Sequence, residues 1–377
     1  MKWHNTWSYT QQDYRSWPSL VGPEMQRIQL ISNHQAKKIR VGFSNLYGVE
    51  DIMFDAVSVR VTNTHNKIDY APVKMFGNTM ICIRPGEEFV SDPIDIEVEI
   101  GSAVEIVSKS LKSFYVTSGT VTYSKQELII ENYNYDNELI SQTDQFKMVM
   151  ENPRMTMIYG ISSLHLLVPN DSKLIVAFGD SLTQQGFWVN QLKVHLRQLG
   201  KNNVTVLNRG IGGNRVLKGT DLTEDGYYRH GKAGLERFER DVFGELVPDK
   251  VIVLHGINDF VHQHIYPEDD HVIPEEVIEG LQKYREIIHE YGSKAIIATL
   301  TPLKNSIFYS PKLASGRQHV NKWIRGQKEY DFVLDFDEFV RNSEDEEKLD
   351  FLYDSGDGLH ISDEGGKRIA KRIVDSI

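Results

Sequence analysis

The chain has 377 residues, of which 40% are hydrophobic and 25% charged, a composition typical of a globular protein with room for two domains. Its 53 acidic and 42 basic residues give a formal net charge of -11, which argues against nucleic acid as a partner, because phosphate binding needs a basic face. A single cysteine, Cys82, excludes an intramolecular disulfide and a zinc site built on several cysteines.

The sequence contains no stretch that approaches the roughly 20 consecutive apolar residues of a membrane span. The N-terminal segment lacks the apolar core of a signal peptide, so we expect a cytoplasmic protein, with a secreted form whose signal has been removed as the alternative. Nothing in the sequence predicts the oligomeric state.

The first part of the chain is marked by short runs in which apolar and polar residues alternate. Such runs occupy residues 39–43, 57–61 and 94–100, and turn-forming stretches at 66–67 and 84–87 separate runs of this kind. A period of two indicates strands that are buried on one face only. We therefore predict that residues 1–168 form an antiparallel β-sandwich resembling a jelly roll.

A polar stretch at 168–172 separates this region from a second one with a different pattern. Continuous apolar runs, typical of parallel strands covered on both faces, lie at 174–178, 204–207, 251–254, 295–298 and 332–334. Stretches with helical period alternate with them, at 186–199, 232–244, 275–291, 312–328 and 363–376. We therefore predict that residues 169–377 form a three-layer αβα domain around a parallel five-stranded sheet.

The candidate functional residues follow the predicted strands. The first three strands lead into residues 179–183 (GDSLT), 208–214 (NRGIGGN) and 255–259 (HGIND), and residues 357–360 (DGLH) precede the last helix. Ligand-binding loops of such sheets gather at the carboxyl ends of the strands. We therefore expect these four segments to meet at one edge of the sheet.

Together the segments carry the groups that a serine hydrolase needs. The hydroxyl of Ser181 is a weak nucleophile until a base removes its proton, and the imidazole of His360 can serve as that base. Asp357, three residues earlier, can orient the imidazole and stabilise the cation that forms.

The tetrahedral intermediate of such a reaction carries an oxyanion, which needs fixed hydrogen-bond donors. The backbone N–H of Ser181, the backbone N–H of Gly213 and the side-chain amide of Asn258 are the candidates. Helix capping is the alternative role for Ser181.

The stretches FGDSLT, GIGGN, GIND and DGLH resemble the four signature blocks of the GDSL/SGNH hydrolase family. The resemblance assigns Ser181 as nucleophile, Gly213 and Asn258 as oxyanion donors, and Asp357 and His360 as the remaining catalytic pair.

Two further points come from the resemblance. Gly213 is preferred to Gly212 because it lies five residues after Asn208, which is similar to the spacing in the family. The stretches RVGFSNLYG, RFERDVF and ATLTP resemble a bacterial two-domain subgroup in which a β-sandwich precedes the hydrolase domain.

The resemblance implies a serine esterase that acts through an acyl-enzyme and needs no cofactor. Small acyl esters, acetyl esters above all, of carbohydrates or other polyols are the expected substrates. Two alternatives remain: an acyltransferase that uses the same serine and histidine, and a non-catalytic glycan-binding protein.

Two groups of residues near the predicted site allow different interpretations. Phe187, Trp188 and Tyr227 can line a substrate pocket, with core packing as the equal alternative. A second group would suit a metal ion, although a serine mechanism gives a metal no task, so we expect none; it comprises His255, His262, His264, Asp269, Asp270 and His271.

Overall fold

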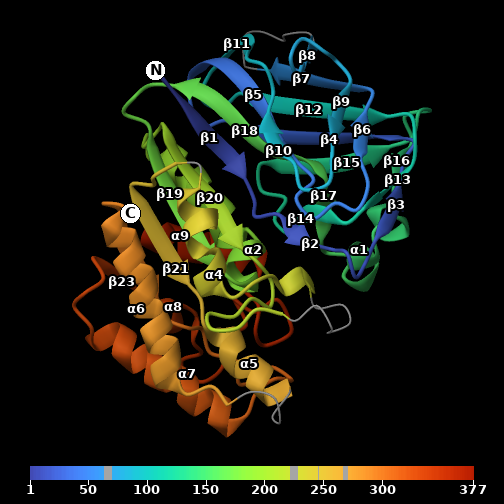
Figure 1. The fold of residues 1–377 in the computed structure, drawn as a ribbon. Coiled ribbons are helices and arrows are strands. Elements are labelled where there is room, and N and C mark those ends of the chain that lie inside the picture. The colour runs from blue at the N-terminus through green and yellow to red at the C-terminus, as the bar shows by residue number, and fades with distance from the viewer. Residues whose placement is uncertain (63–69, 221–227, 245, 266–270) are drawn as a thin grey trace. The chain divides into compact units, whose positions relative to one another are not determined.

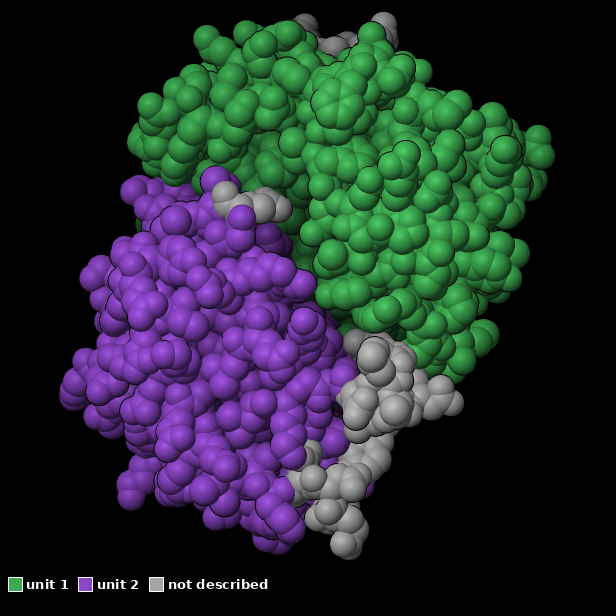
Figure 2. Space-filling view, viewed as in Figure 1, with its two compact units in different colours: residues 1–172, 199–205, 222–229 green, residues 173–198, 206–221, 230–377 purple. Residues whose placement is uncertain are grey.

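The computed structural model describes the chain except for residues 63–69, 221–227, 245 and 266–270 (Figure 1). The chain forms two compact units, coloured separately in Figure 2. The first comprises residues 1–172, 199–205 and 222–229, and the second residues 173–198, 206–221 and 230–377. A division into domains at 168/169 stays a prediction.

The first unit is built from antiparallel strands. One sheet has the order β1 (Lys2–Ser8), β18 (Gly160–Val168), β5 (Ala36–Ser44) and β10 (Glu88–Val90), with β11 (Ile94–Val98) also paired to β5. The second has the order β16 (Leu139–Ile140), β15 (Leu128–Tyr133), β4 (Glu24–Ile31), β12 (Ala103–Ser110), β7 (Ala56–Thr62) and β8 (Ala71–Pro72).

Shorter elements complete this unit. They are β2 (Gln12–Asp13), β3 (Ser19–Val21), β6 (Ile52–Phe54), β9 (Ile81–Ile83), β13 (Phe114–Val116), β14 (Ser118–Thr122), β17 (Thr156–Ile158), the 3-10 helix η1 (Gln142–Asp144) and the helix α1 (Lys147–Glu151).

A single apolar core lies between the two sheets. Strand β4 alternates buried and partly exposed residues along its whole length, and its Ile28 belongs to the same buried cluster as Val59 of β7 and Phe43 of β5. This alternation is what a strand covered on one face requires. The predicted β-sandwich is therefore confirmed. The predicted turn at 84–87 is closed by a hydrogen bond from Glu87 N–H to Arg84 O, and the turn at 66–67 lies outside the described residues.

The second unit contains the predicted parallel five-stranded sheet. Its order is β20 (Val204–Gly210), β19 (Lys173–Gly179), β21 (Lys250–Leu254), β22 (Lys294–Ala298) and β23 (Phe332–Leu334). Its helices are α2 (Ser181–Gln184), α3 (Phe187–Gln198), α4 (Gly234–Phe243), α5 (Ile257–Ile265), α6 (Pro274–Glu290), α7 (Pro311–Gly326), α8 (Phe336–Val340) and α9 (Asp363–Ile373). The 3-10 helix η2 (Tyr228–His230) spans the boundary between the two units in the sequence.

The sheet is buried on both faces. Phe178 of β19 and Val253 of β21 pack with Phe238 of α4 and Leu281 of α6 in one cluster. The alternate residues of the same strands, such as Ala177, are buried as well, which agrees with a sheet covered on both sides. The αβα fold class is confirmed, and α4 and α6 lie on one side of the sheet in Figure 1.

Local signals explain several helix ends. Ser310 and Ser362 accept hydrogen bonds from the third residue of α7 and α9, respectively, and α6 and α7 begin with proline. The sequence prediction missed α1, α2, α5 and α8, which are short or begin within three residues of the end of a strand. Among the described residues, no helix is long and apolar enough to cross a membrane.

Candidate active site

Ser181 stands at the sharp change from strand to helix after β19. Strand β19 ends at Gly179, and Asp180 caps the helix by accepting the N–H of Leu182 at 3.0 Å. Ser181 is the first residue of α2 and is partly exposed. The cap is therefore the carboxylate of Asp180, and the hydroxyl of Ser181 is left for another role.

The structure brings Ser181, His360 and Asp357 together. The Oγ atom of Ser181 lies 2.9 Å from Nε2 of His360, and Nδ1 of His360 lies 2.7 Å from Oδ2 of Asp357. A carboxylate can only accept, so Nδ1 carries the proton and Nε2 is free to accept the proton of the serine hydroxyl. This is the hydrogen-bond pattern of a nucleophile, a base and an orienting acid.

The loop around Asp357 fixes the carboxylate. Its Oδ1 accepts the backbone N–H groups of Leu359 at 3.1 Å and His360 at 2.8 Å. Partial burial alone would raise the pKa of Asp357, but the hydrogen bond and positive charge of His360, with the two backbone donors, outweigh burial and hold this pKa well below its usual range. Asp357 is therefore ionised at neutral pH.

The candidate oxyanion donors are the backbone N–H groups of Ser181 and Gly213 and the side-chain amide of Asn258. Among the described residues, the structure records no hydrogen-bond acceptor for the backbone N–H groups of Ser181, Gly212 or Gly213. Gly213 has φ +72°, and a Cβ there would meet Nδ1 of His230 at 2.1 Å, so only glycine fits. The amide of Asn258 donates to Asn214 O at 3.2 Å and has a second N–H.

Asp259 anchors the helix that carries Asn258. It is fully buried, and its carboxylate accepts the backbone N–H groups of Val216 at 2.9 Å and Leu217 at 3.1 Å. Burial raises the pKa of Asp259 to about 6, an effect that these hydrogen bonds partly offset. Asp259 thereby ties the start of α5 to the segment that follows Gly213.

The proposed pocket residues are Phe187, Trp188 and Tyr227, of which the structure describes the first two. Trp188 is fully buried, donates from Nε1 to Leu182 O at 3.0 Å and packs edge-on against Phe336. It is a core residue, which is the second of the two roles that the sequence left open for it, and no ring surface remains for a ligand. Phe187 is partly exposed at the start of α3, and Tyr227 lies outside the described residues.

Two of the four histidines that suggested a metal, His255 and His262, have other partners. His255 is buried, with Nδ1 3.1 Å from the hydroxyl of Tyr284 and Nε2 3.1 Å from Asn214 O. Nδ1 of His262 contacts Arg215 at 2.8 Å. Asp269 and Asp270 lie outside the described residues, and the described part of the chain holds no group of three side chains suited to a metal.

Sequence reasoning missed three residues that support the site: Asp180, Asn214 and Arg237. Asp180 and Asn214 could have been found from the sequence, because they are the immediate neighbours of Ser181 and Gly213. Arg237 lies in the RFERDVF stretch, where an arginine four residues before an aspartate looks like an ordinary surface ion pair. The structure places it in the interior instead.

The model of the GDSL-like lipase/acylhydrolase family matches residues 175–373, just over half of the chain. The protein belongs to this family. It is accordingly a carboxylic ester hydrolase, and the match covers the segments that carry Ser181, Gly213, Asn258, Asp357 and His360.

Solved structures similar to this GDSL hydrolase cover about half of it. A lipolytic protein of the G-D-S-L family from Desulfitobacterium hafniense is 19% identical, with a TM-score of 0.41 over 54% of this chain and 99% of its own. The acetyl xylan esterase AlAXEase is 21% identical, with a TM-score of 0.42 over 54% and 99%. A GDSL-like lipase from Bacteroides thetaiotaomicron is 18% identical, with a TM-score of 0.40 over 55% and 90%. No curated protein matches the sequence.

Proposed function

We propose that this GDSL hydrolase cleaves carboxylic esters through an acyl-enzyme on Ser181. The observation that carries the proposal is the continuous hydrogen-bonded line from Ser181 Oγ through His360 to Asp357, with contacts of 2.9 and 2.7 Å. A serine with this arrangement is an activated nucleophile, whereas a structural serine needs no such base.

Acylation begins when Ser181 Oγ attacks the ester carbonyl and its proton passes to Nε2 of His360. The carbonyl oxygen becomes an oxyanion, which the N–H groups of Ser181 and Gly213 and the amide of Asn258 stabilise. Asp357 stabilises the imidazolium that forms. The intermediate collapses by breaking the bond to the alcohol oxygen, and the departing alcohol takes the proton from Nε2.

Deacylation repeats these steps with water. His360 accepts a proton from water as its oxygen attacks the acyl carbon, and the same donors hold the second oxyanion. Collapse breaks the bond between Ser181 Oγ and the acyl carbon, and Oγ recovers its proton from His360. The products are a carboxylic acid and a free enzyme.

Small acyl groups on carbohydrates or other polyols are the proposed substrates. Support for this finer assignment comes from the sequence resemblance to a two-domain subgroup. A panel of esters from acetate to long acyl chains, with acetylated sugars included, tests it. Partition of the acyl group between water and added alcohols separates a hydrolase from an acyltransferase.

The central experiment is hydrolysis of p-nitrophenyl acetate by the wild type, Ser181→Ala and Ser310→Ala. Ser310 is the matched control, because its hydroxyl caps α7 by accepting the N–H of Leu313. We expect Ser181→Ala to lose at least ~10³-fold in kcat and Ser310→Ala to keep its rate. Equal rates for the wild type and Ser181→Ala would contradict the proposal.

A further inference from the structure

Arg237 is a buried cation whose acceptors lie in the segments that carry two of the proposed oxyanion donors. Its side chain, on α4, is 1% exposed and pairs with Asp241, one turn later, at 2.8 Å. Its Cζ lies 4.1 Å from the centre of the Phe178 ring. A buried charge is retained only where its donors find acceptors, so the partners of this guanidinium show what it holds in place.

The remaining partners of Arg237 lie at the ends of two neighbouring strands. Nη2 donates to Gly179 O at 2.8 Å, and Nη1 donates to Arg209 O at 3.1 Å. Nε donates to Oδ1 of Asn214 at 2.8 Å. Gly179 immediately precedes Asp180 and Ser181, whereas Arg209 and Asn214 stand on either side of Gly212 and Gly213. One planar group therefore connects the nucleophile segment with the glycine segment.

Asn214 extends this connection to the third donor. Its backbone oxygen accepts the side-chain N–H of Asn258 at 3.2 Å and contacts Nε2 of His255 at 3.1 Å. Burial lowers the pKa of His255 to about 3, so the imidazole is neutral and Nε2–H is its single donor. The hydroxyl of Tyr284 then donates to Nδ1. Asn214 is thus held on its side chain by Arg237 and by the carbonyls of His230 and Lys232, and on its backbone oxygen by two donors.

We propose that Arg237 is a positioning residue that sets the relative placement of the three oxyanion donors without touching the substrate. This inference rests on the proposed function. The fixed fork of a guanidinium reaches acceptors in several directions at once, which the single ammonium of lysine cannot do. Arg237→Lys keeps the charge beside Asp241 but breaks the connection between the segments of Ser181, Gly213 and Asn258.

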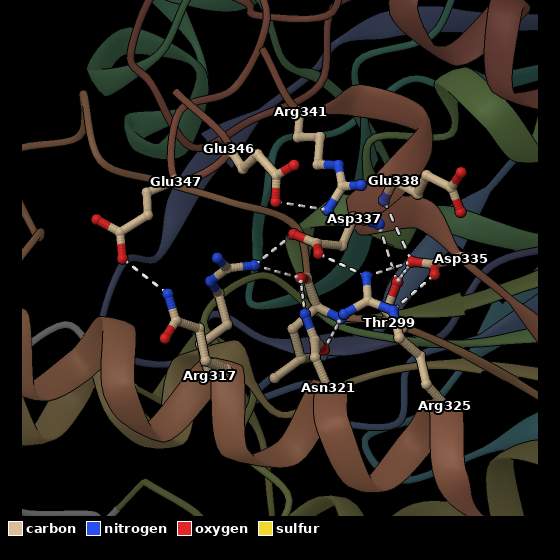
Figure 3. A network of polar contacts seen from close by, with 12 residues as sticks. Thr299, Arg317, Asn321, Arg325, Asp335, Asp337, Glu338, Arg341, Glu346 and Glu347 are labelled. Carbon is tan, nitrogen blue, oxygen red and sulfur yellow. Dashed lines mark hydrogen bonds and ion pairs between the residues drawn. The ribbon is translucent and has the colours of Figure 1, made fainter. Parts of the chain in front are cut away.

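Arg317 provides a matched control, drawn in Figure 3. It is also buried, with 4% of its side chain exposed, pairs with Asp337 at 2.5 Å, and donates to a backbone oxygen, Leu300 O, at 3.0 Å. Its network connects α7 with residues that follow β22 and β23, and it includes Asn321, Arg325, Thr299 and Asp335. None of these residues is a proposed catalytic group, so Arg317→Lys reports the cost of losing a buried guanidinium by itself.

The kinetic arm measures kcat and KM for p-nitrophenyl acetate in the wild type, Arg237→Lys and Arg317→Lys. Loss of oxyanion stabilisation acts on the transition state, so we expect kcat of Arg237→Lys to fall by ~10²-fold while KM changes by less than ~3-fold. Affinity for a phenylboronic acid, which forms a tetrahedral adduct on serine, should fall in parallel with kcat. Arg317→Lys should keep its kcat, its KM and its boronic acid affinity.

The second arm needs no activity and uses amide hydrogen exchange read by mass spectrometry. Arg237→Lys should exchange faster than the wild type at residues 177–184 and 208–216. Arg317→Lys should do so at 299–301 and 335–338 instead. If the wild type hydrolyses no ester faster than Ser181→Ala, the proposed function fails, and the exchange pattern alone then decides whether Arg237 holds the two segments.

A folded Arg237→Lys enzyme with wild-type kcat, or with wild-type exchange at both segments, would overturn the inference. Asn214→Ala covers the case in which Arg237→Lys does not fold. It removes the Oδ1 acceptor of Arg237, together with the hydrogen bonds from Nδ2 to His230 O and Lys232 O, and leaves the ion pair with Asp241 intact. We expect ~10-fold lower kcat from it, as it removes only part of the connection. Unchanged kcat in folded Asn214→Ala would contradict the role of Arg237.

Discussion

The carboxylate of Asp357 binds His360 at two points of the same residue. One oxygen accepts the backbone N–H of His360 at 2.8 Å, and the other faces Nδ1 of its ring at 2.7 Å. The backbone bond fixes where the side chain starts and the ring bond fixes how it is turned. The direction of Nε2 towards Ser181 is therefore determined by one short turn.

Asp357→Asn tests the value of this double contact. An amide keeps the size of the side chain but loses the charge, and it can present an N–H to Nδ1, which would favour the wrong tautomer. We expect kcat for p-nitrophenyl acetate to fall by ~10²–10⁴-fold. Asp363→Asn, an exposed carboxylate in the first turn of α9, should keep its kcat. An Asp357→Asn enzyme within ~3-fold of the wild type would rule out the orienting role.

Asp180 predicts a pH dependence of stability. Burial raises the pKa of Asp180 to about 7, and Oδ2 has no hydrogen-bond partner among the described residues. The folded state keeps a proton that the unfolded chain releases near pH 4, so the stability from this group is full below about pH 4 and is lost as pH rises through 7. Asp180→Asn removes this loss and retains a cap for α2. Its melting temperature should exceed that of the wild type increasingly from pH 4 to pH 8.

Asp331 is the control of opposite sign for this measurement. Burial alone would raise its pKa, but hydrogen bonds from Lys294, the backbone of Ala295 and His289 outweigh burial and lower the pKa of Asp331 to about 2. Its contribution to stability is present above about pH 4 and is lost as pH falls through 2. Asp331→Asn should therefore lower the melting temperature at pH 8. If the melting temperatures of Asp180→Asn and Asp331→Asn changed in the same direction at pH 8, the opposite pKa shifts assigned to the two residues would be contradicted.

Gly213→Ala separates backbone strain from damage to the site. The variant forces a side chain into a left-handed conformation and places Cβ against the ring of His230. Gly292 has φ +75° with open space around it, so Gly292→Ala introduces the same backbone strain without a steric clash. Both variants should lose stability, about 1 kcal/mol for Gly292→Ala. Only Gly213→Ala should also lose kcat, by ~10²-fold as for one oxyanion donor. Equal kcat in the two variants would show that Gly213 is a turn residue only.

Gly366→Ala tests the contact between the helices that follow the base and the nucleophile. A Cβ at Gly366 of α9 would lie 2.6 Å from the backbone carbon of Phe187 in α3, so the helices must separate. We expect the distance from Ser181 to His360 to lengthen and kcat to fall by ~10-fold or more, since small displacements of reacting groups are costly. Gly326→Ala, at the open end of α7, should keep its kcat. The crystal structure of the variant measures the distance directly.

The parts of the fold that could be predicted from the sequence are those in which the hydrophobic pattern of a segment is enough to determine its secondary structure. A strand covered on both faces must be continuously apolar, so residues 174–178 and 251–254 were recognised as β19 and β21. The segments after these strands could be placed together because parallel strands share one carboxyl edge. The helix α5 was missed because Gly256 and Asn258 favour turns, and only the hydrogen bonds of the buried Asp259 reveal what fixes its start.

Side-chain roles that depend on distant partners were beyond the sequence. Trp188 was a candidate for the pocket, yet its ring is fixed by Leu182 O and Phe336 in the core. Arg237 had the spacing of a surface ion pair, and its acceptor Gly179 O lies 58 residues earlier in the chain. No local pattern reports such a distant acceptor, because burial is set by the packing of α4 on the sheet.

The serine and histidine that meet at the site are 179 residues apart in the chain, whereas histidine and aspartate are three apart. A chain still being synthesised therefore carries the proposed nucleophile, Ser181, long before His360 has been added. Contacts of such long range form late in folding, because their loop-closure entropy must be overcome first. We therefore expect a chain to gain hydrolytic activity only after the segment that follows the last strand, β23, has packed beside Ser181.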